Sequence, residues 1–407
     1  MKVLLGALGT LTVLFLCVLH TTSAAAQNGV VLGVGEVGLG IGNVARLTGL
    51  RINAVDKGVE RVNGINLTLW RPRENPDFEM NGLALGLVSP QMDRLRGLGV
   101  GGLAVVSGSF IDGIGLGGLA VVSGGRMRGI GAGGLALVSE GNMQGIGAGG
   151  LALVSQGDVQ GAGVGGLALV AERNLEGIGL GGLAVISQGA MRGLQLGGLA
   201  VVSEGEMFGA QGSLLAVVSQ GGLRGAHASG LAIVSEGPMT GVQSAGLVVV
   251  SQDDLTGLTV SGLATVSQGD LRGINFSGLA TVSEGEMMGL NAAGIAAVSQ
   301  GDQTGINLGG LAVVSQGTAR WLNIGGLGVV AERLVGASVS LGKIATPDQT
   351  GLALASYNDL RGVNRGLSIA IYNYARSSPG VQIGLLNYVR DNPDGLRLLP
   401  LFNHSFR

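Results

Sequence analysis

The chain has 407 residues; 80 of them are glycine, 46% are hydrophobic and only 12% are charged. This composition excludes an intrinsically disordered chain, because disorder requires high charge and low hydrophobicity. The 24 basic and 26 acidic residues nearly cancel, so the chain has no broad basic field and we expect no nucleic-acid partner.

The first residues have the features of a secretory signal peptide. Lys2 supplies a positive charge, Val3 to Leu19 form an apolar run, and Ala24 to Ala26 form a small-residue cleavage site. We expect residues 1–26 to be removed and the mature chain to begin near Gln27. The protein is then exported to the periplasm, the outer membrane or the cell surface, or is secreted.

The only cysteine of the chain lies inside this segment. Leu16 precedes Cys17, where a lipoprotein signal has a small residue, so lipid attachment at Cys17 is disfavoured. Without Cys17 the mature chain has no disulfide, no thiol nucleophile and no thiolate metal ligand.

Residues 27–96 begin with a pattern that imitates a dinucleotide-binding motif. Gly33, Gly35 and Gly38 form G-x-G-x-x-G, and Asp56 lies near the place of a ribose-binding acid. However, no alternation of strands and helices follows Asp56, and a chain so rich in glycine produces such matches by chance. We therefore interpret the segment as divergent repeats that cap an array.

A sixteen-residue unit dominates the chain, as in Gly113 to Ser123 (GIGLGGLAVVS) with its polar link. Units begin every sixteen residues from Gly97 to Trp321 without insertion or deletion, and looser copies flank them. Such a period indicates a repeat array. The expected organisation is a signal peptide (1–26), an N-terminal cap (27–96), a regular array (97–336) and a C-terminal cap with Asn and Tyr (337–407).

The glycines and β-branched residues of the unit exclude helix as its main state. An unbroken strand scatters large side chains over both faces, whereas a corner at Gly117–Gly118 resets the alternation. We expect two short strands per unit. The inward residues are then Ile114, Leu116, Leu119 and Val121, and the outward residues are Gly115, Ala120 and Val122.

The predicted fold is therefore all-β, a β-solenoid with coils of about sixteen residues. Coils stack about 4.8 Å apart, which requires a fixed repeat length. The Met or Leu of each polar link is expected to point inward. Serines at the corner are expected to form a ladder that two alanines interrupt; these residues are Ser107, Ser123, Ser139, Ser155, Ala171 and Ala331.

The alternative fold is an antiparallel β-barrel or hairpin array, including an outer-membrane barrel. An eleven-residue strand has the length that spans a bilayer, and the ending with Phe402 and Phe406 resembles an outer-membrane strand. The few aromatic residues and the lack of a polar alternation disfavour this alternative.

The C-terminal repeats have a different chemistry. Asn358, Asn373, Asn387 and Asn403 recur at the repeat spacing and are expected to form a structural ladder. Tyrosines lie beside them, and a tyrosine offers contact area with a polar tip. The candidate binding surface of the chain is Tyr357, Asn358, Tyr372, Asn373, Tyr374, Asn387 and Tyr388.

The units GLSIAIYNYA (366–375) and GVQIGLLNYV (380–389), the ending GLRLLPLFNHSF and the GGLAVVS repeats carry a resemblance. They resemble the uncharacterised Gly-rich surface-repeat proteins of bacteria, which include leptospiral members described as lipoproteins. The resemblance implies a location in the cell envelope or at the surface, and it implies no activity or site.

No catalytic constellation stands out in the sequence. His20, His227 and His404 are isolated, with His227 assigned to a link, so neither a zinc site nor a catalytic triad is expected, and no cofactor is implied. The favoured function is a non-catalytic structural or interaction protein of the bacterial cell envelope. A β-helical carbohydrate-active enzyme is the catalytic alternative. The partner classes left open are a protein, a glycan, an envelope surface, a membrane and another copy of the chain.

Overall fold

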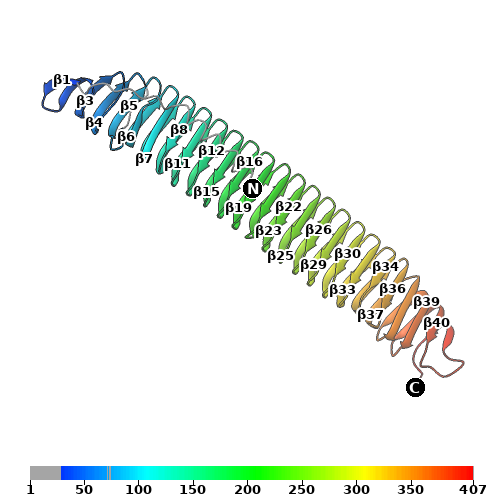
Figure 1. Cartoon of the computed structure of the whole chain (residues 1–407). Helices are drawn as coiled ribbons and strands as arrows, with labels where there is room; N and C mark the ends of the chain where they lie inside the picture. The colour runs from blue at the N-terminus through cyan, green and yellow to red at the C-terminus, as the bar shows by residue number, and fades with distance from the viewer. Residues whose placement is uncertain (1–28, 71, 73–74, 407) are drawn as a thin grey trace.

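The computed structural model describes residues 29–70, 72 and 75–406, and it is a β-solenoid of about 21 turns with repeats of about sixteen residues (Figure 1). Strands account for 70% of the chain, and the described residues contain no helix. The predicted fold class is confirmed. The expected signal peptide, with Cys17, lies outside the described residues.

Seven strands form the N-terminal part of the rod. They are β1 (Gly29–Val34), β2 (Val37–Gly42), β3 (Arg46–Asn53), β4 (Arg61–Thr68), β5 (Glu79–Gly86), β6 (Gln91–Gly101) and β7 (Ala104–Gly117).

Each regular coil combines a short strand with a longer one. The short strands are β8 (Ala120–Ser123), β10 (Ala136–Ser139), β12 (Ala152–Ser155), β14 (Ala168–Ala171), β16 (Ala184–Ser187), β18 (Ala200–Ser203), β20 (Ala216–Ser219), β22 (Ala232–Ser235), β24 (Val248–Ser251), β26 (Ala264–Ser267), β28 (Ala280–Ser283), β30 (Ala296–Ser299), β32 (Ala312–Ser315) and β34 (Gly328–Val330). The long strands are β9 (Arg126–Gly133), β11 (Met143–Gly149), β13 (Val159–Gly165), β15 (Leu175–Gly181), β17 (Met191–Gly197), β19 (Met207–Ser213), β21 (Leu223–Ser229), β23 (Met239–Ala245), β25 (Leu255–Ser261), β27 (Leu271–Ser277), β29 (Met287–Ala293), β31 (Gln303–Gly309) and β33 (Thr318–Gly325).

Seven strands complete the C-terminal end. They are β35 (Arg333–Ser340), β36 (Lys343–Thr346), β37 (Asp348–Leu354), β38 (Tyr357–Val363), β39 (Leu367–Ser377), β40 (Val381–Val389) and β41 (Leu398–Asn403).

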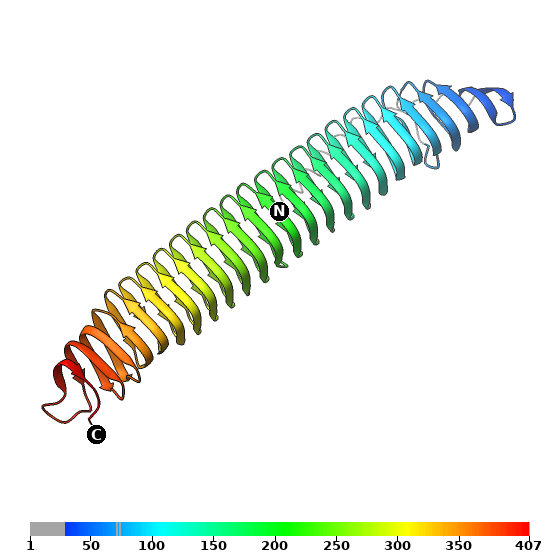
Figure 2. The same cartoon turned by 180° about the vertical axis from the view of Figure 1, so that it is seen from behind.

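Two parallel ladders run along the array, one of short strands and one of long strands (Figure 2). Each residue lies opposite its equivalent sixteen positions away, as in Ala136 with Ala152 and Gly145 with Gly161. The antiparallel alternative is therefore wrong for the array. Among the described strands only the terminal pairs, β1 with β2 and β40 with β41, are antiparallel. These hairpins cover the ends of the stack, where unpaired strand edges otherwise invite further pairing.

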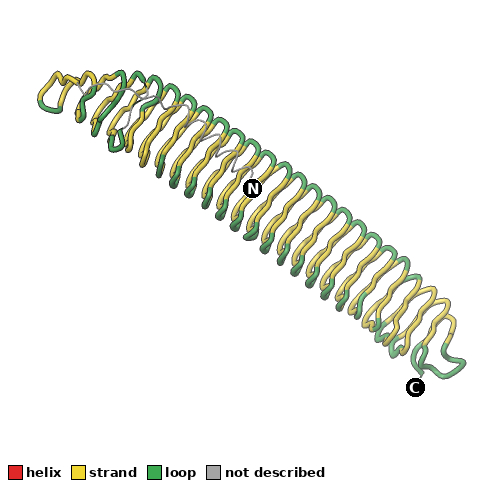
Figure 3. The backbone as a smooth tube through the Cα atoms, in the orientation of Figure 1, coloured by secondary structure: helices red, strands yellow, loops and turns green. Residues whose placement is uncertain are grey.

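Loops follow both edges of the rod (Figure 3). At one edge a two-residue corner, such as Gly150–Leu151, joins a long strand to the next short strand, and at the other a three-residue link, such as 156–158, leads back. Inside each coil the first residue of the long strand, such as Met143, packs with the second residue of the short strand, such as Leu153; both are fully or almost fully buried. The predicted inward position of the link's Met or Leu is confirmed.

The predicted inward and outward positions of the unit are only partly correct. Val121 lies inside and Ala120 and Val122 point outward as expected, but Ile114 and Leu116 are 36% and 38% exposed. In their place Gly115 is buried, while Leu119 occupies the corner.

The reason for this error is that the alternation is never reset. Buried positions alternate with outward ones from Ile111 to Val121, and the φ of 139° at Gly113 does not interrupt this alternation. A Cβ atom on Gly113 would overlap the carbonyl oxygen of Gly97 in the preceding coil. The sequence interpretation placed the reset at Gly117–Gly118, where neither residue has a positive φ.

The corner serines form a row that is buried, and Ala171 and Ala331 occupy the same column. Their hydroxyls bond to backbone: Ser139 Oγ lies 2.8 Å from the carbonyl oxygen of Gly125 and 2.9 Å from that of Gly141. The serine row thus fixes the links of successive coils.

Candidate functional site

The asparagines of the predicted binding surface lie inside the rod. Asn358, Asn373 and Asn387 are fully buried. The Asn358 amide donates to Asn373 Oδ1 at 2.8 Å, and the Asn373 amide donates to Asn387 Oδ1 at 2.8 Å. These three residues are therefore not part of a surface, and the candidate binding surface reduces to the tyrosines.

The four tyrosines point outward on the same strands and form two stacked pairs. The ring centroids are 5.4 Å apart for Tyr357 and Tyr372, and 5.5 Å apart for Tyr374 and Tyr388. Lys343 Nζ lies 5.1 Å from the Tyr357 ring centroid and 2.7 Å from Asp359. Burial, and then the neighbouring tyrosines, raise the pKa of Tyr372. Because the rings cover one another's faces, this patch presents ring edges and hydroxyls instead of an open aromatic platform.

An apolar hollow of about 480 Å³ lies near the C-terminal end. Its walls are Leu354, Ala355, Ile369, Ala370, Ile371, Ile383, Gly384, Leu385 and Leu401. The walls carry no titratable or nucleophilic side chain, so the hollow accommodates apolar groups and does not support a reaction.

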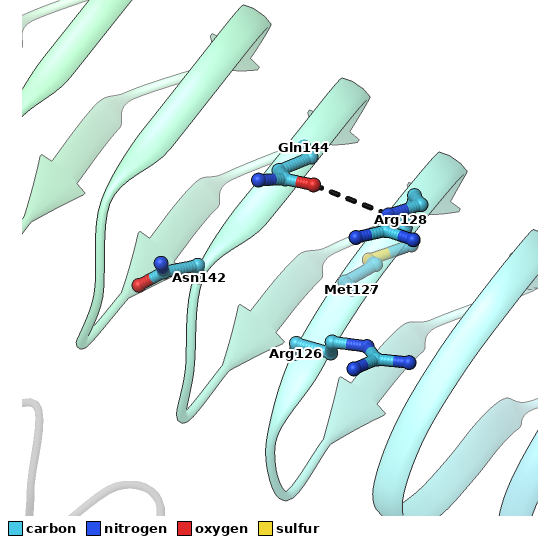
Figure 4. A pocket seen from close by; sticks show the side chains of 5 residues that line it. All are labelled: Arg126, Met127, Arg128, Asn142 and Gln144. Atoms are coloured by element: carbon cyan, nitrogen blue, oxygen red, sulfur yellow. Dashed lines mark hydrogen bonds between the residues drawn. The ribbon is translucent and has the colours of Figure 1, made fainter.

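A second hollow, of about 250 Å³, lies on the corner between β9 and β11 (Figure 4). Its arginines have partners: Arg126 pairs with Asp112 at 3.1 Å, and Arg128 Nε donates to Gln144 at 3.2 Å. Arg126 also lies 4.9 Å from the Phe110 ring centroid. This site is a solvated corner in which side-chain contacts connect neighbouring coils.

The glycine motif near the N-terminus does not have the geometry of a dinucleotide site. Gly33 lies opposite Gly38 in the β1–β2 hairpin, so the motif follows an antiparallel turn. Asp56 is buried, forms an ion pair with Arg51 and accepts a hydrogen bond from Thr68 at 2.6 Å. Its carboxylate therefore stabilises the N-terminal coils.

The sequence interpretation missed a buried polar column inside the array. In the first regular coils the third position of the unit is Gly115 or its equivalent, but from Gln195 onward this position is polar and fully or almost fully buried. The polar residues of this column are Gln195, Gln211, His227, Gln243, Thr259, Asn275, Asn291, Asn307 and Asn323. Their sixteen-residue spacing was visible in the sequence, but the incorrect alternation placed them outside.

His227 belongs to this column and lies in β21, so its assignment to a link was wrong. Its side chain is buried and neither ring nitrogen has a hydrogen-bond partner. Burial lowers the pKa of His227 to about 4, because the charged imidazolium loses its hydration. Gln243, on the next coil, also lacks partners for its amide group. Within the described part of the chain, no group of three His, Cys, Asp or Glu residues is placed to hold a metal ion.

A row of leucines is exposed at the two-residue corners. Their exposed fractions run from 40% at Leu263 to 64% at Leu327, apart from Leu119, which is half-buried. We call this row the leucine edge; it consists of Leu103, Leu119, Leu135, Leu151, Leu167, Leu183, Leu199, Leu215, Leu231, Leu247, Leu263, Leu279, Ile295, Leu311 and Leu327.

Charged residues gather at the opposite corner. We call it the polar edge; it consists of the three-residue links, such as 156–158, and the outward residue that follows the first residue of each long strand, such as Gln160. Ion pairs between coils lie along it: Arg126–Asp112, Arg192–Glu176, Arg224–Glu206, Arg272–Asp254, Arg320–Asp302 and Arg333–Asp348. The rest of each unit, which runs from its first position to the end of the short strand, is uncharged. This holds for every unit between Gly113 and Ala331.

No family model matches this chain, and no curated protein or solved structure matches it. Over the residues that the structure describes, no helix has the length and apolar character to cross a membrane.

Proposed function

We propose that this protein is exported and acts as a non-catalytic interaction surface of the bacterial cell envelope. The observation that carries the proposal is the leucine edge. Monomeric soluble proteins rarely expose a continuous apolar surface of this extent, and such surfaces mark sites of association with partners or membranes. The features of residues 1–26 support export.

The architecture also supports a binding role over catalysis. Coils hold equivalent side chains in line at about 4.8 Å intervals, which produces long and regular surfaces. Along the rod, charged side chains pair between coils at the polar edge, and the polar side chains of the array's column are buried inside the coils.

Cell fractionation tests the proposal. The full chain is compared with a version that lacks residues 1–26 and with an edge variant carrying Leu151→Gln, Leu167→Gln and Leu183→Gln. We expect the full chain in the envelope fraction, the truncated chain in the cytoplasm, and the edge variant in the soluble extracytoplasmic fraction. A full chain that stays in the cytoplasm, or an edge variant that stays with the envelope, contradicts the proposal.

A further inference from the structure

We infer that the leucine edge inserts among the acyl chains of a lipid layer while the polar edge remains in water. This inference rests on the proposed function and names the partner of its surface. The rod then lies along the membrane plane, with every regular coil in the same orientation towards the lipid.

The backbone of the leucine edge is already paired between coils. The Leu151 N–H donates to the Leu135 carbonyl at 2.7 Å, as does the Ala152 N–H at 3.1 Å. The Gly150 N–H donates to the Gly133 carbonyl at 3.0 Å. Unpaired backbone groups prevent most irregular structure from entering lipid. Here the N–H groups of the corner have protein partners, so the leucine side chains enter lipid without leaving these N–H groups unpaired.

The side chains of the array are distributed as an apolar surrounding requires. In β27 the neighbours Asn275 and Phe276 point in opposite directions: Asn275 is fully buried, whereas Phe276 is 42% exposed. A coil folded for water on all sides has the reverse arrangement, because burial favours the aromatic side chain and disfavours the amide. The exposed Phe276 instead extends the apolar surface that begins at Leu279.

The shape of this surface favours lipid over a second copy of the chain. The leucine edge is a convex corner, and apolar side chains continue from it onto both adjoining faces, as Ile146 and Val154 do beside Leu151. Two convex edges touch along a line and leave these faces in water. A fluid acyl layer contacts the edge and both faces at once.

Trp321 lies at the boundary between the polar and apolar surfaces. It follows Arg320, which pairs with Asp302 at 2.8 Å on the polar edge, and it precedes Leu322 of the apolar face. Its side chain is 70% exposed. Tryptophan concentrates at the boundary between acyl chains and water, where the ring is buried and its N–H reaches a polar partner.

Flotation with vesicles of phosphatidylcholine tests the inference. We compare the full chain, the edge variant, and a control variant with Gln156→Ser, Gln188→Ser and Gln220→Ser on the polar edge. The three proteins share residues 1–28, so a difference between them does not come from that segment. We expect the full chain and the control to float, and the edge variant to bind at least about tenfold more weakly.

Two further measurements complete the test. In a Trp70→Phe background the emission of Trp321 shifts to shorter wavelength when vesicles are added. Binding is unchanged at 1 M NaCl and on adding phosphatidylglycerol, because the leucine edge carries no charge. Circular dichroism establishes that all variants are folded, as we expect for changes at exposed side chains.

Several results overturn the inference. A full chain that does not float, an edge variant that floats equally well, or binding that requires phosphatidylglycerol each contradict it. An edge variant that changes from dimer to monomer in sedimentation, with unchanged flotation, assigns the surface to a second copy. If the edge variant leaves the envelope in cells but vesicles do not bind the full chain, the proposed function stands with a protein partner and the lipid inference fails.

Discussion

Replacing Gly113 by alanine tests whether the first position of the unit requires glycine. The φ of Gly113 is 139°, a conformation that costs a residue with a side chain about 1–3 kcal/mol. The added Cβ also overlaps the Gly97 carbonyl, so the coils must separate and weaken inter-coil hydrogen bonds worth about 1 kcal/mol each. We expect Gly113→Ala to lower the free energy of unfolding by about 3–5 kcal/mol.

Gly328 provides the matched control. Its φ is not positive, the nearest atom to an added Cβ is the Lys343 carbonyl oxygen at 3.7 Å, and the equivalent residue of the preceding coil is Ala312. Gly328→Ala is expected to be neutral or to stabilise by up to about 1 kcal/mol, since alanine restricts the unfolded chain. Urea unfolding followed by circular dichroism compares the two. Equal unfolding midpoints would refute the requirement for glycine at position 113.

Three further substitutions probe individual columns by urea unfolding. Trp321 has φ of 79° at a position where other coils have glycine, so Trp321→Gly should stabilise the protein by about 1 kcal/mol; a loss of stability contradicts this. The pKa of His227 falls from 6.5 to about 4 on folding, so the unfolded chain takes up a proton at a higher pH than the folded chain. The resulting contribution to the free energy of unfolding, about 3 kcal/mol, is complete above pH 6.5 and disappears as the pH falls towards 4. His227→Gln should remove this pH dependence, and an unchanged profile refutes the assignment. Asn291→Ala leaves an amide donor and an amide acceptor of its neighbours unpaired, so we expect the free energy of unfolding to fall by about 2–4 kcal/mol. Asn323→Ala leaves only one donor unpaired, and we expect a loss of about 1–2 kcal/mol. Equal losses would count against the hydrogen-bonded asparagine ladder.

The repeat length determines much of this fold, and it is read directly from the sequence. An uninterrupted period requires equivalent positions to stack, and this identifies the coils, the two kinds of corner and the serine row from the spacing of residues alone. The inward position of Met127 follows as well. Met127 is the apolar residue at the end of a polar link, and an apolar side chain at this point is buried by turning towards the core.

The positions of Ile114 and Leu116 could not be derived in the same way. The alternation along a strand predicts which residues share a face only while the backbone remains regular. Here the alternation continues without a break from Ile111 to Val121, so the reset assumed at Gly117–Gly118 does not occur. The premise that bulky residues face inward then favoured the incorrect alternative, and it concealed the leucine edge and the buried position of His227.

The narrow interior of the coil explains why bulky side chains point outward. A Cβ atom on Gly147 would lie 2.6 Å from Met143 Sδ and 2.8 Å from Leu153 Cδ1, so a coil with these two large residues has room only for glycine between them. In later coils the same column holds a polar side chain, and some of these coils have a smaller facing residue, as in Asn275 with Thr281. The interior of such a coil is filled, and its remaining leucines and isoleucines have no interior position. Their exposure follows from the size of the coil, and the proposed contact with lipid would remove these side chains from water.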